Sequence, residues 1–373
     1  MSAPPPLEAT HVDIRAIERE LTALWQSAAE SAEAGHSAPV TRTCLANLVV
    51  VVDNRESALH ATRVVQQLTA VYPNRAIVAA ALPEAPGAPA LDAWVQALCQ
   101  LPVPGRPQVC GEQITIEARG QAAAHIPGVV LPLLVPDVPV AIWLPRGNPA
   151  GHPVARRLAD VADRLIVDSE TFDGPQNALA ALAGLIGGEA CVSDLAWARL
   201  TRWRELVAQF FDAPAARRQL PEIELLEITV ATPPGIQASR SPALLLAGWL
   251  ATRLGWRVEG RGENARLLRQ DGAQVRLEVA TVPAGDGQDD RLASLTLICR
   301  AAHFSVTRVA AGDVVATRAE IEGRWQIRRS LPLERLDEVA LVAGELQLLG
   351  RDPTFESALL VAAALAVDER GAM

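Results

Sequence analysis

The chain has 373 residues, enough for two domains of ordinary size, each with its own core. Its formal net charge of −9 disfavours a nucleic-acid-binding surface, so we expect no nucleic-acid partner. The sequence contains arginine but no lysine, which excludes lysine Schiff-base chemistry and the lysine of a phosphate-binding loop.

The cysteines are few and widely separated. None forms the C-x-x-C pair that zinc ribbons and thioredoxin-type sites require. No secretory signal peptide begins the sequence, so we expect a reducing, cytoplasmic location. The most apolar window, Ile126–Pro145, contains repeated prolines and Asp137, which would interrupt a membrane-spanning helix. We therefore expect no membrane association.

Residues 1–40 predict one helix and a linker. After a proline-rich beginning, apolar residues recur at helical spacing from Val12 to Ala28. A run rich in alanine, glutamate, serine and glycine then leads to Pro39, which is typical of a linker.

Residues 41–190 predict an α/β domain. The stretch Cys44–Asn54 contains a continuous β-branched run, which is typical of a strand buried on both faces. Strands then alternate with helices, which favours right-handed crossovers and a mostly parallel, helix-covered sheet. The predicted strands are Cys44–Asn54, Arg75–Leu82, Val109–Arg119, Val138–Leu144 and Arg164–Asp168, and the predicted helices are Arg55–Tyr72, Leu91–Leu101, Gln121–Leu134, a helix that ends at Ala162, and Pro175–Ile186.

Residues 191–220 predict a connecting helical segment. Apolar residues recur at spacings of four and three between Ser193 and Asp212, which indicates one amphipathic helix or a helix pair, with Ser193 or Asp194 as its N-cap. Its apolar face carries Trp197 and Trp203. One interpretation is that the indoles wedge two domains together; the other is that part of this face docks another protein, because tryptophan and arginine are common interface anchors.

Residues 221–373 predict an α+β domain with an antiparallel sheet. Its short strands are separated by turn residues, and Asp271-Gly272 and Gly312-Asp313 are typical of hairpin turns. The predicted strands are Leu225–Ala231, Trp256–Glu259, Ala265–Arg269, Val275–Val282, Leu292–Arg300, Phe304–Val309, Val314–Ile321 and Trp325–Arg329, and the predicted helices are Pro242–Leu254, Leu333–Leu349 and Phe355–Val367.

One segment matches the glycine pattern of dinucleotide-binding sites. Gly260, Gly262 and Ala265 fit G-x-G-x-x-A, but a strand rather than a helix is predicted after them, so no helix N-terminus would face a pyrophosphate. We interpret this segment as a hairpin loop. No glycine-rich loop follows the first predicted strand either, and we expect no bound cofactor or metal.

Catalytic motifs are also absent from the sequence. It has no G-x-S-x-G and no H-E-x-x-H pattern. His125, Cys44 and Cys110 are most simply structural, although a functional thiol is an alternative. Asp137 and the group Asp163, Arg164, Asp168 and Ser169 flank predicted strands, where a structural network that fixes the loops is the simplest interpretation.

Basic residues gather in the predicted antiparallel sheet, at Arg318, Arg324, Arg328 and Arg329. A solvated face is the usual explanation of such a group, and an anion or partner site is the alternative.

Several short motifs follow one another between about residues 42 and 212. Their residues are Arg42, Cys44, Asn47, Arg75, Cys110, Glu112, Gln113, Asp137, Trp143, Asp163, Arg164, Asp168, Ser169, Trp197, Arg199, Trp203, Arg204, Phe211 and Asp212. In their order and spacing these motifs together resemble one family, the glucose-6-phosphate dehydrogenase assembly proteins called OpcA.

The resemblance implies a non-catalytic assembly factor or allosteric activator, which binds glucose-6-phosphate dehydrogenase and supports its oligomeric active form in the oxidative pentose phosphate pathway. The candidate partner-binding residues are Trp197, Arg199, Trp203, Arg204, Arg324 and Arg328. Two alternatives stay open. One is a sugar-phosphate hydrolase or isomerase that uses Glu112, Asp137 and Asp168 at the sheet edge, and the other is a metabolite-sensing binding protein.

Overall fold

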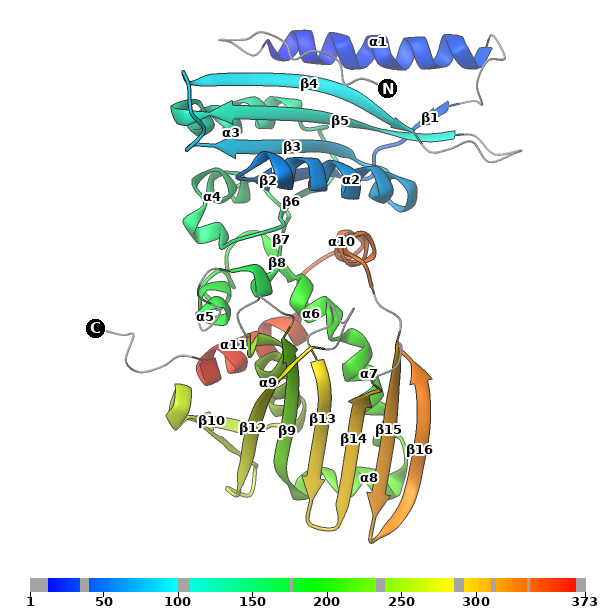
Figure 1. Ribbon diagram of the computed structural model, residues 1–373, viewed down its shortest axis with the longest axis vertical. Coiled ribbons are helices and arrows are strands. Elements are labelled where there is room, and N and C mark those ends of the chain that lie inside the picture. The colour runs from blue at the N-terminus through cyan, green and yellow to red at the C-terminus, as the bar shows by residue number, and fades with distance from the viewer. Residues whose placement is uncertain are drawn as a thin grey trace. The chain divides into compact units, whose positions relative to one another are not determined.

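A computed structural model describes residues 13–33, 40–99, 108–172, 174, 177–232, 239–284, 292–309, 313–333 and 336–366 (Figure 1). The chain divides into two compact units, and both are discontinuous in sequence. Unit 1 is Met1–Asp168, Gly187–Ser193 and Asp337–Gly350; unit 2 is Ser169–Ile186, Asp194–Leu336 and Arg351–Met373.

Unit 1 is built on a mostly parallel sheet with the strand order β1-β5-β3-β2-β6-β7-β8, to which β4 adds an antiparallel edge beside β5. The predicted fold class of this half is confirmed. Continuous apolar runs give the central strands: every residue of β2 and of β3 is buried, as expected for strands covered on both faces. The strands are β1 (Val40–Arg42), β2 (Asn47–Val52), β3 (Arg75–Leu82), β4 (Ala90–Cys99), β5 (Gln108–Arg119), β6 (Val140–Leu144), β7 (Arg164–Val167) and β8 (Cys191–Asp194).

Five α-helices of unit 1 are described, and one of them comes from the last part of the chain. They are α1 (Ile14–Glu33), α2 (Arg55–Val71), α3 (Ile126–Val130), α4 (Pro153–Ala159) and α10 (Glu338–Leu346). Helix α10 packs against α2, and the His60 ring nitrogen Nε2 lies 2.5 Å from a carboxylate oxygen of Glu338. Local sequence patterns do not reveal that the chain returns to the first sheet.

One predicted helix of unit 1 is wrong. The segment Leu91–Leu101 was expected to be helical, but residues 90–99 form the strand β4. Burial alternates along it, with Leu91, Ala93 and Val95 inside and their neighbours more exposed. Pairing with β5 therefore overrides the helix propensity of its alanines and leucines. The predicted helix Gln121–Leu134 is broken as its prolines require, into η1 (Gly120–His125), α3 and η2 (Leu131–Leu133).

Unit 2 contains a second sheet with the order β10-β11-β12-β9-β13-β14-β15-β16. Its pairs are antiparallel, as predicted, except that β9 and β12 run parallel. The strands are β9 (Ile223–Thr232), β10 (Arg257–Glu259), β11 (Arg266–Leu268), β12 (Gln274–Pro283), β13 (Leu292–Cys299), β14 (Ala302–Arg308), β15 (Val314–Ile321) and β16 (Arg324–Pro332).

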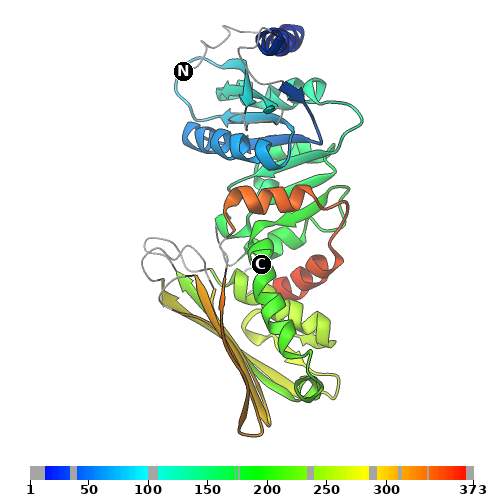
Figure 2. The ribbon, with the colours of Figure 1, turned by 90° about the vertical axis from the view of Figure 1, so that its right-hand side faces the viewer.

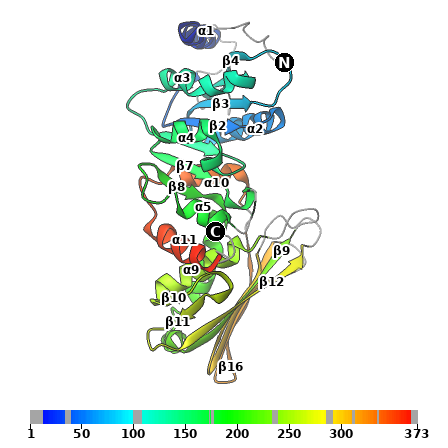
Figure 3. The same ribbon diagram turned by 90° about the vertical axis from the view of Figure 1, so that its left-hand side faces the viewer.

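The described helices of unit 2 lie on one side of this sheet (Figures 2 and 3). Helix α7 packs on β14 and helix α9 on β9. Phe304 of β14 faces α7, and its ring centroid lies 5.6 Å from that of Phe210 and 5.0 Å from that of Phe211. The helices are α5 (Ala178–Ala183), α6 (Leu195–Arg199), α7 (Thr201–Phe210), α8 (Pro214–Arg217), α9 (Ser241–Leu254) and α11 (Pro353–Ala366).

Helices α9 and α11 approach each other closely at Gly248. A Cβ atom there would lie 2.2 Å from the backbone oxygen of Ala358, so only glycine permits this separation. Helix α9 ends at Gly255, whose φ of 65° is the left-handed conformation that commonly terminates a helix.

The segment with the glycine pattern is a hairpin loop, as predicted. It joins the antiparallel strands β10 and β11 through the short 3₁₀ turn Gly262–Asn264. At Gly260 a Cβ atom would lie 2.6 Å from the backbone oxygen of Asn264, so the glycine serves a tight turn. Asp271-Gly272 forms the expected turn between β11 and β12, with a φ of 84° at Gly272. Gly312 lies outside the described residues, so the predicted Gly312-Asp313 turn stays a prediction.

Candidate functional site

The segment Ser193–Asp212, predicted as a helix or helix pair, contains the consecutive helices α6 and α7, although its first two residues end the strand β8. Asp194 is the N-cap of α6. Its Oδ1 atom accepts hydrogen bonds from the backbone N–H of Ala196, at 3.0 Å, and of Ser169, at 2.9 Å. Its Oδ2 atom accepts a further hydrogen bond from the Ser169 hydroxyl at 2.7 Å. The carboxylate is thus fully engaged in fixing the start of α6.

Trp197 and Trp203 lie inside unit 2, with 5% and 1% of their surfaces exposed. The Trp197 indole N–H donates to a carboxylate oxygen of Asp352 at 3.1 Å, and its ring centroid lies 5.6 Å from that of Phe355. The Trp203 indole nitrogen has no hydrogen-bond acceptor among the described residues. Both indoles therefore stabilise unit 2, and neither side chain is positioned to anchor a partner directly.

One arginine stacks on the Trp197 ring, and another lies two residues further along the chain. The Arg204 guanidinium carbon stacks 3.5 Å from the centre of the indole ring, a cation–π contact. Arg204 also donates to the Trp197 carbonyl oxygen at 2.8 Å and to the Thr201 hydroxyl at 2.9 Å. Arg199 lies 3.2 Å from a carboxylate oxygen of Glu170, and 30% of its side chain stays exposed. Arg199 and Arg204, which we call the guanidinium rim, thus lie partly exposed at the edge of the rigid aromatic core around Trp197.

The two other candidate arginines lie on β16, the edge strand of the second sheet, and both are exposed. Arg328 pairs in register with Arg318 of β15. Arg329, the next residue along the strand, pairs with the buried Thr317 and therefore belongs to the opposite face. The predicted basic patch is thus divided between two faces of the sheet.

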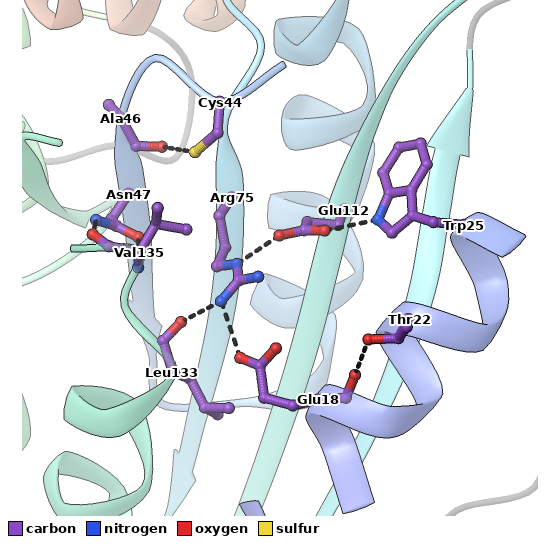
Figure 4. A network of polar contacts seen from close by, with 10 residues as sticks. All are labelled: Glu18, Thr22, Trp25, Cys44, Ala46, Asn47, Arg75, Glu112, Leu133 and Val135. Atoms are coloured by element: carbon purple, nitrogen blue, oxygen red, sulfur yellow. Dashed lines mark hydrogen bonds and ion pairs between the residues drawn. The ribbon is translucent and has the colours of Figure 1, made fainter. Parts of the chain in front are cut away.

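A buried polar network joins several of the family-motif residues at the amino ends of the strands of unit 1 (Figure 4). Arg75 and Glu112 are each 5% exposed, and the Arg75 Nε atom donates to the Glu112 carboxylate. The Arg75 Nη1 atom donates to the Leu133 carbonyl oxygen at 2.8 Å and to the Glu18 carboxylate at 3.0 Å. The Trp25 indole N–H donates to the other Glu112 oxygen at 2.8 Å.

The network attaches helix α1 to the sheet, because Glu18 and Trp25 both belong to α1. Neither residue was among the sequence candidates. Their spacing of seven residues places them on one face of the helix, next to the buried Leu21, and this spacing was the available signal. Glu112 has hydrogen bonds at both oxygens, so its carboxylate is already engaged by protein donors.

Cys44 and Asn47 adjoin this network. The Asn47 side chain forms two hydrogen bonds with the backbone of Val135, at 2.9 Å and 2.8 Å, and fixes the loop before β6. The Cys44 thiol donates to the Ala46 carbonyl oxygen at 3.4 Å. Burial raises the pKa of the Cys44 thiol, and the negative charge of Glu112 raises it further. A neutral thiol is a poor nucleophile, so the geometry supports the structural interpretation of Cys44.

The remaining motif residues hold loops and strands in place. Arg164, 6% exposed, donates to the Ser193 hydroxyl at 2.7 Å and to the carbonyl oxygens of Leu348 and Gly350 at 2.9 Å and 2.7 Å. Asp163 accepts from the Val140 backbone N–H at 2.7 Å. Other motif side chains are in the core: Gln113 and Trp143 are fully buried, and Phe211 packs on Phe304. The side chains of Arg42 and Cys110 lie outside the described residues, and Asp212 lies just after α7, where its carbonyl oxygen accepts from Arg217.

The carboxylates of the alternative enzyme are not brought together. Glu112 pairs in register with Arg75, the first residue of β3, and Asp137 precedes β6, so both lie at the amino ends of the parallel strands. Asp168 follows the last residue of β7 and lies at the carboxyl end. Asp137 is exposed, with a φ of 61° that fits its turn between prolines. Within the described ranges, no three or more His, Cys, Asp and Glu side chains are grouped as metal ligands would be.

A pocket of about 610 Å³ opens at the carboxyl edge of the same sheet. Its lining combines apolar and charged residues: Asp53, Asn54, Arg55, Leu82, Pro83, Glu84, Ala85, Pro86 and Arg119. Asn54 caps α2 by accepting from the Ser57 backbone N–H at 2.8 Å, so a side chain of the protein occupies the position where an anion would meet the helix. Arg55 lies 2.5 Å from Glu117 and Arg119 lies 3.3 Å from Asp92, so both guanidiniums are paired.

His152 caps α4 near this edge, accepting from the Ala155 backbone N–H at 3.3 Å. Burial lowers the pKa of His152, while the Asp53 carboxylate acts in the opposite direction. The ring is therefore neutral at pH 7, and the charged groups that line the pocket balance each other. This balance favours an uncharged ligand over a phosphate.

Comparison with known proteins gives a consistent result along the chain. Residues 65–184 match the family model described as the glucose-6-phosphate dehydrogenase subunit N-terminal domain, and residues 190–359 match the corresponding C-terminal domain. A putative OxPP cycle protein OpcA from Synechocystis sp. is 29% identical over 70% of this chain and 58% of its own length. Its counterpart from Nostoc punctiforme is 30% identical over 68% of this chain and 57% of its own length.

The chain thus spans somewhat under three fifths of the length of these relatives. Among solved structures, a 3-ketoreductase from Actinomadura kijaniata is similar with a TM-score of 0.45 and 12% identity, over 85% of this chain and 96% of that chain. None of the helices in the described part of the chain has the length and apolar character needed to cross a membrane.

Proposed function

Because the chain belongs to the family of glucose-6-phosphate dehydrogenase assembly proteins (OpcA), we propose that it binds this dehydrogenase and supports its oligomeric, active form without catalysing a reaction itself. The observation that carries the proposal is the match of both consecutive domain models of a glucose-6-phosphate dehydrogenase subunit to residues 65–184 and 190–359. The role would serve the oxidative pentose phosphate pathway.

The chemistry of the buried polar groups supports a non-catalytic role. Glu112 and Asp194 are held by donors of the protein itself, and burial keeps the Cys44 thiol protonated. Catalytic acids and bases need an accessible, tuned proton, whereas these groups fix the shape of the two units. A protein whose buried polar residues hold its structure rigid is suited to present a fixed surface to a partner.

Activation by such a partner is a matter of differential binding. The chain can raise dehydrogenase activity only if it binds the active oligomer more tightly than the inactive form. A tenfold preference corresponds to about 1.4 kcal/mol, which one or two well-placed charged contacts can supply.

We assign the surface that contacts the dehydrogenase to the guanidinium rim, which consists of Arg199 and Arg204. Arg199 is partly exposed and lies at the end of α6, and Arg204 is held over the indole in one orientation. An arginine whose geometry is fixed loses little entropy on binding, which makes it an efficient interface residue. In this proposal Trp197 and Trp203 position the rim; Arg324 and Arg328 of β16 are exposed but do not belong to it.

The test is a co-purification with the cognate dehydrogenase, followed by an activity assay with and without this chain. We expect a stable complex, higher activity in its presence, and no turnover of phosphosugars or lactones by the chain alone. The double substitution Arg199→Ala/Arg204→Ala should weaken the complex, whereas Arg202→Ala, at an exposed position of the same helix pair, should not. If the folded double variant activates the dehydrogenase normally, the assignment of the rim is wrong but the proposed function stands.

The pocket of unit 1 favours a second candidate function, the sensing of a metabolite. Its volume of about 610 Å³ lies in the usual range for small-molecule sites, and it occupies the carboxyl edge of a parallel sheet, where such sites commonly form. Its balanced charges favour a neutral, hydroxyl-bearing ligand. A thermal-shift screen with neutral sugars, sugar phosphates and nucleotides tests this, because a ligand of the native state raises the melting temperature. No shift with any class would remove the sensing candidate.

A further inference from the structure

The sheet of unit 2 has one covered face and one open face. Alternate residues such as Leu297, Phe304 and Ala319 are at most 1% exposed and lie beneath the helices. The residues between them point to the other side, where none of the helices described for unit 2 is placed (Figures 2 and 3). We call this side the open face. Antiparallel sheets often leave one face to solvent, so its chemistry decides whether it does more.

One row of paired residues crosses the open face from β12 to β16. Two carboxylates stand at one end, two hydroxyls in the middle and two guanidiniums at the other end. In order across β12, β9, β13, β14, β15 and β16 the row is Glu278, Glu227, Thr296, Ser305, Arg318 and Arg328. The sequence separates these residues widely, and only the strand register reveals the order of their charges.

One of the two neighbouring rows contains only small side chains. It consists of Ala280, Thr229, Ser294, Thr307, Ala316 and Ser330. Small residues keep this part of the face flat, so that a second surface can approach it closely. The row on the other side carries larger side chains, among them Leu225, Ile298 and His303. The open face therefore combines one flat part with opposite charges at its two sides.

We propose that the open face binds the open face of a second copy of this chain. The two copies would be related by a two-fold axis that lies between the stacked sheets, parallel to the strands and above the boundary between β13 and β14. Such an axis exchanges β12 with β16, β9 with β15, and β13 with β14. Glu278 then faces Arg328 of the second copy, Glu227 faces Arg318, and Thr296 faces Ser305. Every charged residue of the row meets the opposite charge, as a self-complementary two-fold interface requires.

The dimensions fit a dimer. Neighbouring strands lie about 4.8 Å apart, so the row is about 24 Å wide, and strands of this length are also about 24 Å long. One copy would bury roughly 600 Å², and the pair roughly 1,200 Å², which reaches the range of specific interfaces. Stacked sheets lie about 10 Å apart, a separation that glutamate and arginine side chains can span together.

The charge pattern favours a second copy over another partner. A uniformly acidic surface would meet repulsion at Glu227 and Glu278, and a uniformly basic one would meet it at Arg318 and Arg328. Within the chain, Arg276 lies 3.8 Å from Glu278, but both side chains are more than half exposed, so the carboxylate stays accessible. The inference goes beyond the proposed function and does not rest on it.

Sedimentation equilibrium of the full chain at low and high salt tests the proposal. We expect a dimer that dissociates more readily at high salt, because the contacts are charged and near the surface. The substitution Arg318→Glu/Arg328→Glu should weaken self-association about a hundredfold, and so should Glu227→Arg/Glu278→Arg, because each faces like charges across the axis. Arg329→Glu, on the same strand but at a position of the opposite face, should leave the dimer unchanged.

Mixing the two charge-reversed variants distinguishes this arrangement from any other dimer. One variant then presents an entirely acidic row and the other an entirely basic row, so the mixture should form heterodimers although each variant alone does not. A monomeric wild-type chain at low salt, a dimer that both reversals leave intact, or a mixture that stays monomeric would overturn the proposal. A monomeric chain whose binding to the dehydrogenase is lost in Arg318→Glu/Arg328→Glu would likewise overturn it, and would assign the open face to that enzyme.

Discussion

The two sheets differ in where their charged residues lie. In unit 1 both faces of the central strands are apolar, and the charged residues Arg75 and Glu112 are buried at the strand ends, where they hold a helix against the sheet. In unit 2 one face of the sheet carries an ordered row of polar residues, and Arg318 and Arg328 at its end stay exposed. Buried charges hold the fold through partners within the chain, whereas exposed charges in an ordered row can also be reached from outside. The comparison therefore separates residues that maintain the fold from residues that can bind.

The largest expected effect comes from breaking the network of unit 1. Arg75→Ala leaves the Glu112 carboxylate buried without its main partner and should lower the free energy of unfolding by about 3–5 kcal/mol. Urea unfolding measures the change. The matched substitution in unit 2, Arg318→Ala, removes an exposed charge and should change stability by no more than about 0.5 kcal/mol at concentrations below self-association. Equal losses for the two would contradict the comparison.

A smaller effect is expected where helices of unit 2 touch. Gly248→Ala forces a methyl group against the backbone oxygen of Ala358, only 2.2 Å from the Cβ position, and should destabilise the protein by about 1–3 kcal/mol. Gly344→Ala in α10 of unit 1 is the control, because a Cβ there meets nothing within 4 Å, and helix propensity predicts a gain of about 0.5–1 kcal/mol. Thermal melts of the two variants should therefore shift in opposite directions. A melting temperature that rises for both would contradict the close contact.

The buried thiol of unit 2 predicts a dependence on pH. Burial and the nearby Glu224 carboxylate raise the pKa of Cys299 from 9.0 to about 12. As the pH rises, the thiol of the unfolded chain loses its proton before the thiol of the folded chain does. The contribution of Cys299 to the free energy of unfolding is therefore complete below pH 9 and is lost between pH 9 and about 12. Unfolding free energies across this window should fall less steeply for Cys299→Ala. Parallel curves for the two proteins would show that the thiol does not titrate as proposed.

The smallest effect is expected at the pair that joins α2 and α10. His60 and Glu338 are in contact, but their side chains are 48% and 30% exposed. Solvent screens such pairs, so Glu338→Gln should cost no more than about 1 kcal/mol. A loss comparable with that of Arg75→Ala would mean that α10 depends on this pair far more than its exposure indicates.

Local patterns in the sequence predicted most of the fold. Continuous apolar runs predicted β2 and β3, and turn pairs such as Asp271-Gly272 located a hairpin. The failure at Leu91–Leu101 has a physical cause, because an alanine-rich edge strand shows little period until its partner β5 is known. The return of α10 to unit 1 depends on tertiary packing and is invisible to any local pattern.

The site was less predictable than the fold. The sequence singled out Trp197 and Trp203 but could not decide between core and surface, and the structure buries both. Glu18 and Asp352, the partners of Arg75 and Trp197, are distant in sequence from the residues they hold, so no spacing connects them. The charged row of the open face can be recognised only when the register of the strands is known.

The most direct test of the proposed function is the initial rate of the cognate dehydrogenase, measured at fixed substrate while this chain is added in increasing amounts. The account predicts a saturable increase in rate, with a midpoint that matches the affinity of the complex measured separately. A rate that is unchanged at saturating concentrations, or activity of the chain alone on a sugar phosphate, would contradict it.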